Sequence, residues 1–363
     1  MRNSTAKKTM KPRKRKNKST KRNHVSRTSS ASSSASKTLR ILGVKAGLAA
    51  SKKRHSSSKS IQDVHAEFTS WYFESVTKPL PYGQVRQIAE AYQHAFYLKK
   101  KSTNLPILLP LTHSAAAVVS ASDEEGTLGA VLHELSRLPL QEIIVVLNGC
   151  SDNSYAVARE YPLVTIIYEP ERVGHDVGRA IGAQMTTAET VLFTDGDIVI
   201  SAEQLAPFLY AVDTGVDMAL NDLRSYLPSF ANQDTVTRLK SYLNSVLNRR
   251  DLGASSLISV PHALSKKCIQ TIGYSSLVVP PLAQTTAIQK GCTVEVASSV
   301  DVITKNRRRL GNVGKGNSVE QMIIGDHAEA LSSLLSTLHG EAEAKTEASL
   351  LSRVEIARWR NAK

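Results

Sequence analysis

The strongest constraint on the fold is a regular alternation of short apolar runs with helical segments after Pro110. The apolar runs cover residues 116–120, 142–147, 163–168, 190–194 and 217–220. Such runs are long enough for buried strands, and the segments between them are long enough for helices. The alternation predicts an α/β fold in which a mostly parallel sheet is flanked by helices on both faces.

Two further helices are expected before the sheet. Between residue 61 and about residue 101, apolar side chains recur at helical spacing. The aromatic run Trp71, Tyr72 and Phe73 has two interpretations, a platform for a sugar ring or ordinary packing. Packing is the preferred interpretation, because large aromatic side chains are mostly buried.

The positive charge of the chain is confined to its first 60 residues. The formal net charge is +14, but residues 1–60 hold 19 Lys or Arg and no acidic residue. The remaining 27 basic and 32 acidic residues give the rest of the chain a formal charge of −5, which does not indicate a nucleic-acid-binding domain. We predict that residues 1–60 form a disordered, Ser-rich tail, which either contacts an anionic surface or only keeps the protein soluble.

The cysteines and the hydropathy pattern indicate the cellular compartment of the protein. The three cysteines have neither CxxC nor metal-ligand spacing, which favours free thiols in a reducing compartment. The most apolar stretch, residues 105–121, is too short and too polar for a membrane span, and the basic start does not resemble a secretory signal. We therefore expect a cytoplasmic protein, with peripheral attachment to a membrane as an option.

Polar residues end several of the predicted strands, where ligands bind in open α/β sheets. The first run leads from Ser120 to Glu124, and the second leads into Asn148 and Asp152. After the fourth run, Asp195-Gly196-Asp197 places two carboxylates directly behind a buried strand. Carboxylate oxygens suit Mg²⁺ or Mn²⁺, and an ion held there can neutralise a diphosphate.

Together these segments resemble the family 2 glycosyltransferases, which have a GT-A type (Rossmann-like) nucleotide-sugar fold. Residues 120–124 resemble the P-x-Y-N-E pattern, 147–152 the D-D-G-S-x-D turn, and 174–182 the G-x-x-x-A-R-N-x-G segment. The resemblance implies a nucleoside diphosphate sugar as donor and Mg²⁺ or Mn²⁺ as cofactor. It also implies a nucleotide site with the residues Ser120, Glu124, Asn148, Asp152, Arg179 and Asp195, and metal binding by Asp195 and Asp197.

The chain departs from this family at the expected catalytic base. After the acceptor-side loop 253–256, inverting members open a helix with an acidic pair, but this chain has Pro280-Pro281. Proline cannot take up a proton, so the base has moved, the reaction retains configuration without one, or activity has been lost. Asp222 and Asp326 are the candidate replacements, and each is equally consistent with a helix or turn cap.

Two histidines and one basic loop complete the candidate site. His327 is a candidate third metal ligand, with an ordinary histidine near a helix start as the alternative; His262 is a weaker candidate. The basic, Gly-rich segment 305–316 is interpreted as a lid over the diphosphate or as a solvated loop.

The domain prediction is a tail at 1–60, a helical extension at 61–104, a glycosyltransferase-like catalytic domain at 105–340 and a C-terminal helix at 341–363. The acceptor is a glycan, a lipid or a small molecule. Two other functions are open: a sugar-phosphate nucleotidyltransferase, and a non-catalytic module that binds nucleotide sugars. The acidic segment 122–125 disfavours the first, because it would repel a triphosphate.

Overall fold

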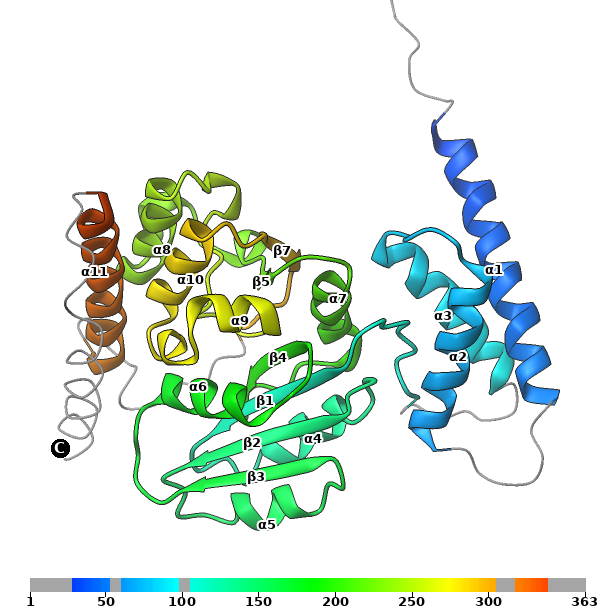
Figure 1. Ribbon diagram of the computed structural model, residues 1–363, viewed down its shortest axis with the longest axis horizontal. Coiled ribbons are helices and arrows are strands. Elements are labelled where there is room, and N and C mark those ends of the chain that lie inside the picture. Colours follow the sequence, from blue (N-terminus) through cyan, green and yellow to red (C-terminus); the bar gives the residue numbers. More distant parts are fainter. Residues whose placement is uncertain (1–27, 53–59, 98–104, 305–316, 339–363) are drawn as a thin grey trace, which may run out of the picture.

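The computed structural model describes residues 28–52, 60–97, 105–304 and 317–338 and contains a central seven-stranded sheet (Figure 1). The strand order is β3-β2-β1-β4-β6-β5-β7. The strands are β1 (Ala115–Ala121), β2 (Glu142–Asn148), β3 (Val164–Glu169), β4 (Thr190–Asp195), β5 (Met218–Asn221), β6 (His262–Ser265) and β7 (Val294–Ser298). Only β6 runs antiparallel to its neighbours, which are β4 and β5. The prediction of a mostly parallel α/β fold is confirmed, although β6 and β7 were not predicted.

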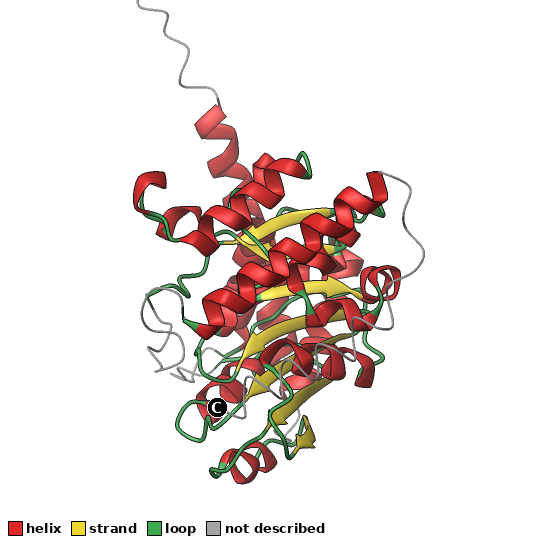
Figure 2. Ribbon diagram, turned by 90° about the vertical axis from the view of Figure 1, so that its left-hand side faces the viewer, coloured by secondary structure: helices red, strands yellow, loops and turns green. Residues whose placement is uncertain are grey.

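Helices cover both faces of the sheet, and Figure 2 shows several of them in front of the strands. One face packs on α4 (Leu128–Leu135), α5 (Ser154–Arg159) and α7 (Ala202–Asp213). The other packs on α6 (His175–Met185), α9 (Lys266–Ile272) and α10 (Pro280–Gln289), and beyond these lie α8 (Thr235–Val246) and α11 (Ser318–Leu338). Short 3₁₀ helices cover Arg224–Tyr226, Phe230–Asn232, Arg250–Leu252 and Tyr274–Val278.

Strand β1 shows why a continuous apolar run folds as a central strand. All seven of its residues are buried, and successive side chains enter opposite cores: Val119 joins the core with α4 and α7, whereas Val118 joins the core with α6. Full burial of one valine side chain contributes about 1.5–3 kcal/mol. Burial on both faces removes the alternation of polar and apolar residues seen in half-exposed strands.

The small residues of α6 bring that helix close to the sheet. A Cβ atom on Gly182 would lie 2.4 Å from Cγ1 of Val118, and one on Gly178 would lie 2.8 Å from Oγ of Ser120. Both contacts are shorter than the packing of a side chain permits. The close approach places Arg179, the residue after Gly178, at the carboxyl ends of β1 and β4.

Among the described residues, three helices precede the sheet: α1 (Thr28–Lys52), α2 (Ile61–Ser75) and α3 (Tyr82–Phe96). A capping box opens α2, in which the Asp63 amide donates to Oγ of Ser60 at 3.1 Å and the Ser60 amide donates to the Asp63 carboxylate at 2.9 Å. Trp71 packs against Tyr92 of α3, with 5.4 Å between ring centroids. The aromatic run therefore contributes to helix packing.

The prediction of disorder across residues 1–60 is wrong for Thr28–Lys52, which form α1. The helix packs on α3, so tertiary contact stabilises a segment whose Ser-rich composition predicts disorder. Residues 1–27, the basic segment 305–316 and residues 341–363 lie outside the described residues. Within the described part of the chain, no helix combines the length and apolar character that a bilayer crossing requires.

Candidate active site

The carboxyl ends of β1, β2 and β4 meet at one edge of the sheet. In the parallel registers, Ser120 of β1 pairs with Asp195 of β4 and with Val146 of β2. The structure thus brings together Ser120, Asn148 and Asp195, which were predicted from separate sequence segments.

The Asp195-Gly196-Asp197 turn follows β4 directly. The Gly196 amide donates a hydrogen bond of 2.8 Å to the Ser120 carbonyl oxygen, which ties the turn to β1. A Cβ atom on Gly196 would lie 2.8 Å from Cβ of Ala121, so a larger residue would push the turn away. Asp195 is only 8% exposed, whereas Asp197 is half-buried. Of the two carboxylates, Asp197 is therefore the more accessible to a ligand.

Arg179 is the cation that accompanies Asp195. Its guanidinium is buried, with Nη2 3.3 Å from Oδ1 of Asp195 and Nη1 2.8 Å from Oδ1 of Asp176. Nη1 also donates to the carbonyl oxygen of Leu257 at 3.2 Å. Burial acts to lower the pKa of Arg179, but Asp195 and Asp176 outweigh it and raise that pKa. The ion pairs compensate for much of the cost of burying these charges.

The loops that follow β1 and β2 are joined by reciprocal hydrogen bonds. The Glu125 amide donates to the Asp152 carboxylate at 2.8 Å, and the Asn153 amide donates to the Glu125 carboxylate at 3.0 Å. The buried Ser154 hydroxyl accepts from the Glu124 amide at 2.9 Å. Asp152, predicted near the nucleotide, therefore also holds these two loops together.

Asn148 fixes a third loop. Its Nδ2 donates to the Gly174 carbonyl oxygen at 2.8 Å, and its Oδ1 accepts from the Val173 amide at 2.9 Å. The side chain is predicted to face the nucleotide, and the structure shows it positioning the loop before α6. No local sequence pattern indicates this contact, because the partners are main-chain atoms 25 and 26 residues away along the chain.

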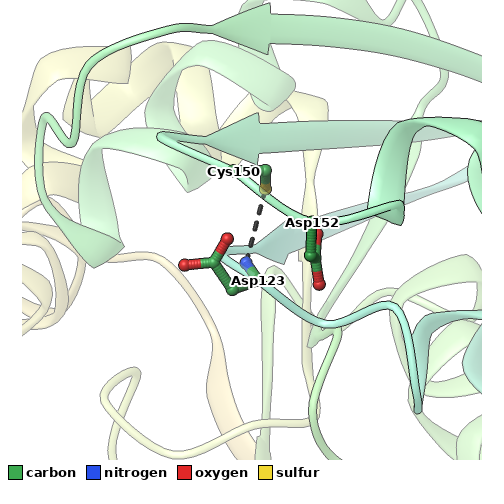
Figure 3. Close-up of side chains that lie close together, drawn as sticks. All are labelled: Asp123, Cys150 and Asp152. Carbon is green, nitrogen blue, oxygen red and sulfur yellow. Dashed lines mark hydrogen bonds between the residues drawn. The ribbon is translucent and has the colours of Figure 1, made fainter.

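Figure 3 shows Asp123, Cys150 and Asp152 close together at the ends of β1 and β2. Over the described residues, they are the one group of three potential metal ligands whose ligand atoms all lie within 4.8 Å of one another. Their contacts are internal: Asp123 Oδ1 accepts from the Ser151 amide at 2.7 Å, and Asp123 also pairs with Arg172. Burial, with Asp123 and Asp152, raises the pKa of the Cys150 thiol, which favours its neutral form. The cluster is accounted for by loop packing.

His327 does not join the two aspartates. It lies well inside α11, where Nδ1 is 2.7 Å from the Ile323 carbonyl oxygen, so Nδ1 carries the proton. Burial lowers the pKa of His327, and Lys240 of α8 is the charged group that lowers it further. No three-ligand group found among the described side chains contains His327 with Asp195 and Asp197. Its metal-binding role stays a prediction without geometric support.

The two candidate bases lie on different elements. Asp222 follows β5, and its carboxylate accepts from Arg224 Nε at 2.9 Å and Nη2 at 2.6 Å. These hydrogen bonds hold the pKa of Asp222 below its usual value, which makes it a weaker base. Asp326 lies inside α11 rather than near its start. At the position of the missing acidic pair, Pro280 and Pro281 are buried in the first turn of α10.

Buried amides, which the sequence analysis missed, support the loop 253–256. Asn244 Nδ2 donates to the carbonyl oxygens of Gly253 and Ser255 at 2.8 and 3.0 Å. Gln284 Nε2 donates to Asn244 Oδ1 at 2.8 Å, while Gln284 Oε1 accepts from the Leu257 amide at 3.0 Å. Asn244 and Gln284 lie in α8 and α10, whose polar residues do not by themselves indicate which face is buried.

Two further buried groups lie near Arg179. Lys240 Nζ donates to Oγ of Ser259 at 3.0 Å, and burial, together with Arg179, lowers the pKa of Lys240 to about 8. His262 stacks on Phe193 with 5.1 Å between ring centroids, and burial lowers the pKa of His262 to about 3. His262 is therefore a neutral packing residue, in line with its weaker ranking as a metal ligand.

One family model matches part of the chain. The model for glycosyl transferase family 2 matches residues 116–267, and curated protein sequences give no match. Glucosyl-3-phosphoglycerate synthase from Mycobacterium tuberculosis, in complex with uridine diphosphate, aligns at 16% identity and TM-score 0.47, over 60% of this chain and 80% of that chain. Mannosyl-3-phosphoglycerate synthase from Rubrobacter xylanophilus aligns at 15% identity and TM-score 0.45, over 65% and 77% of the two chains. Similarities this distant carry no weight for the substrates of the present chain.

Proposed function

We propose that the domain containing residues 116–267, which the family 2 glycosyltransferase model matches, transfers a sugar from a nucleoside diphosphate sugar to a hydroxyl acceptor. The observation that carries this proposal is the Asp195-Gly196-Asp197 turn at the end of the central strand β4, tied to β1 through Gly196. Carboxylates on this turn lie at the sheet edge where α/β folds bind ligands.

The residues present fit a divalent cation. Asp197 is half-buried and offers hard oxygen ligands, and Asp195 has a second carboxylate oxygen besides the one paired with Arg179. A bound Mg²⁺ or Mn²⁺ would neutralise negative charge on the leaving nucleoside diphosphate. We assign Asp197 as the direct ligand, and Arg179 as the group that holds Asp195 in place.

The neighbouring polar residues are proposed to form the nucleotide site. Ser120 Oγ is buried and has no hydrogen-bond partner among the described residues, so it can bind a ligand without breaking an internal contact. Glu124 and Asp152 are proposed to lie around the base and ribose. Asn148 is proposed to act by fixing the main chain at residues 173–174 against the nucleotide.

The metal assignment is tested by Asp197→Ala. Binding of uridine, guanosine and thymidine diphosphates is measured by calorimetry and thermal shift, with and without Mn²⁺. We expect at least a tenfold loss of the metal-dependent affinity, because a charged ligand is removed. The control is Glu160→Ala, an exposed acid after α5, which should bind like the original protein. Undiminished metal-dependent binding by the Asp197 variant would contradict the assignment.

Asp222 is the proposed base, because it lies at the carboxyl edge after β5, and it must first separate from Arg224. With an acceptor identified, Asp222→Asn should lower kcat at least a hundredfold and leave donor affinity within about twofold, as for loss of a general base. Equal rates for the variant and the original protein would remove Asp222 from the chemistry and leave Asp326 as the remaining candidate.

A non-catalytic nucleotide-sugar module is the second candidate, favoured by the absence of any acid in the first turn of α10. The two functions differ in turnover of the bound donor. A glycosyltransferase hydrolyses its donor slowly when no acceptor is present, whereas a binding module returns the donor intact. Tight binding without hydrolysis across the donor panel would favour the module.

A further inference from the structure

Helix α1 presents two unlike faces. One packs on α3 through small residues: a Cβ on Gly47 would lie 2.2 Å from the Tyr92 carbonyl oxygen, and one on Gly43 would lie 2.5 Å from that of Ile88. Ala50 is buried on the same side. Helices can approach this closely only where side chains are absent or small, so α1 is held in one rotational setting on α3.

A different face of α1 carries an exposed apolar stripe. Ile41, Val44 and Leu48 are 55%, 40% and 37% exposed, and their spacing of three and four residues places them side by side along the helix. Single exposed apolar residues are ordinary, but three aligned on one helix mark a contact surface. Because the glycine face fixes the rotation of α1, the stripe stays directed outward.

Cations border this stripe. Lys37 and Lys52 lie beyond its two ends, while Arg40 and Lys45 flank it on either side at 100° per residue; all four are exposed. The helix contains no acidic residue. The sequence before α1 adds to this charge, since residues 1–27 contain 12 Lys or Arg and no acid. The surface therefore combines an apolar centre with a positive border.

We propose that α1 docks flat on an anionic lipid bilayer, with Ile41, Val44 and Leu48 entering between headgroups whose phosphates pair with the bordering cations. An interfacial helix of this kind combines apolar insertion with attraction to acidic lipids. A second copy of α1 is disfavoured as the partner, because its positive border would be repelled by the positive border of the first. A nucleic acid would engage the cations but would leave the apolar stripe in water.

The position of α1 suits this role. Its main contacts within the described structure are with α3, and Figure 1 shows it on the side of α2 and α3 that faces away from the sheet. Docking through α1 would leave the carboxyl edge of the sheet uncovered. The inference does not depend on the proposed transferase activity, because binding to lipid is measured separately from binding of nucleotide.

The test is sedimentation of the full chain with vesicles of phosphatidylcholine containing 30% phosphatidylglycerol, chosen as about one acidic lipid in three. We expect Ile41→Gln with Leu48→Gln to lower the partition coefficient at least tenfold, and the difference to persist at high salt, where attraction to residues 1–27 is screened. The matched control is Ala49→Gln, at an exposed position beside the stripe, which should change the partition coefficient less than twofold.

The positive border has its own test. Lys37→Gln with Lys45→Gln should weaken binding about fivefold at low salt and much less at high salt, and vesicles of phosphatidylcholine alone should bind the original chain weakly. Equal partitioning of the Ile41/Leu48 variant and the original chain would overturn the proposal, provided that their circular dichroism spectra and melting temperatures match. Equal binding of the original chain to neutral and acidic vesicles would also overturn the proposal. So would binding of the chain to RNA with no binding to vesicles.

Insertion itself is read by fluorescence. Tryptophan introduced as Leu48→Trp should shift its emission to the blue on addition of acidic vesicles and be quenched by brominated lipid. The emission of a tryptophan introduced as Ala49→Trp, one residue after Leu48 and beside the stripe, should change far less. Equal responses at the two positions would show that the stripe does not enter the bilayer.

Discussion

The two halves of the sheet support the candidate site by different means. Around β1, β2 and β4, carboxylates are held by loop amides and by the buried guanidinium of Arg179. Beside β6 and β5, neutral amides of Asn244 and Gln284 hold the loop 253–256, and the nearby cation Lys240 has no ion pair within the described structure. The first half depends on balanced charge, and the second depends on the shape of an amide network. Mutations can test this division.

The largest loss of stability is expected from Arg179→Leu, which removes the positive charge from the buried ion pairs. It leaves Asp195 and Asp176 without their buried cation, and breaking such a pair costs about 3–5 kcal/mol. Urea denaturation measures the loss of unfolding free energy. If the double variant Arg179→Leu, Asp195→Asn recovers most of that loss, charge imbalance is the cause. No recovery would show that packing of the guanidinium matters more.

Lys240 predicts a pH effect in the second half. Its pKa is about 8 in the folded protein against 10.5 as the reference value, so between those pH values the unfolded chain binds more protons. The contribution of this group to stability should rise from pH 8 to pH 10.5, by at most about 3 kcal/mol, and should be level below pH 8, where both states are protonated. Lys240→Met should reduce this rise in the pH profile of unfolding free energy. An unchanged profile would mean that the ammonium reaches water.

Asn244→Ala tests whether the amide network supports only the half of the sheet that contains β5 and β6. It removes the donor to Gly253 and Ser255 and leaves Gln284 Nε2 without that acceptor, at a cost of about 1–3 kcal/mol. Because the loop lies outside the half of the sheet where we propose the nucleotide site, affinity for nucleoside diphosphate with Mn²⁺ should stay within about twofold. A tenfold loss of that affinity would show that the two halves are not supported independently.

The smallest effect is expected from Arg172→Leu. Arg172 pairs with Asp123 in the first half, but its side chain is 54% exposed, and exposed ion pairs contribute at most about 1 kcal/mol. Thermal unfolding should show a shift of no more than a few degrees. A loss as large as that of Arg179→Leu would show that exposure does not separate these two arginines.

The sequence was most informative where one strand leads directly into a site. The apolar run before Asp195 predicts both the strand and its position, and Asp195 lies at the sheet edge because it is the last residue of β4. The order of motifs also indicated the family, which the match over residues 116–267 confirms. Local pattern and global position agree there because few residues separate the strand from the carboxylate.

Other features depend on contacts that no local pattern contains. The Asn148 amide binds main-chain atoms of residues 173–174, and the Lys240 ammonium is buried against Ser259. Strand β6 is only four residues long and pairs with β4 and β5, elements distant in sequence. Helix α1 has a composition that predicts disorder, and it owes its order to Gly43 and Gly47 against α3.

The reversed direction of β6 has a consequence for how this architecture can vary. Because β6 is antiparallel and His262, its first residue, pairs with Phe193 near the end of β4, the chain segment that enters β6 arrives at the carboxyl edge of β4, where we propose the nucleotide site. In an all-parallel sheet, every loop on that edge leaves a strand and leads into a helix. Here an incoming connection, residues 253–261, lines the same edge, so insertions there would reshape the proposed acceptor side without altering strand register or the Asp195-Gly196-Asp197 turn.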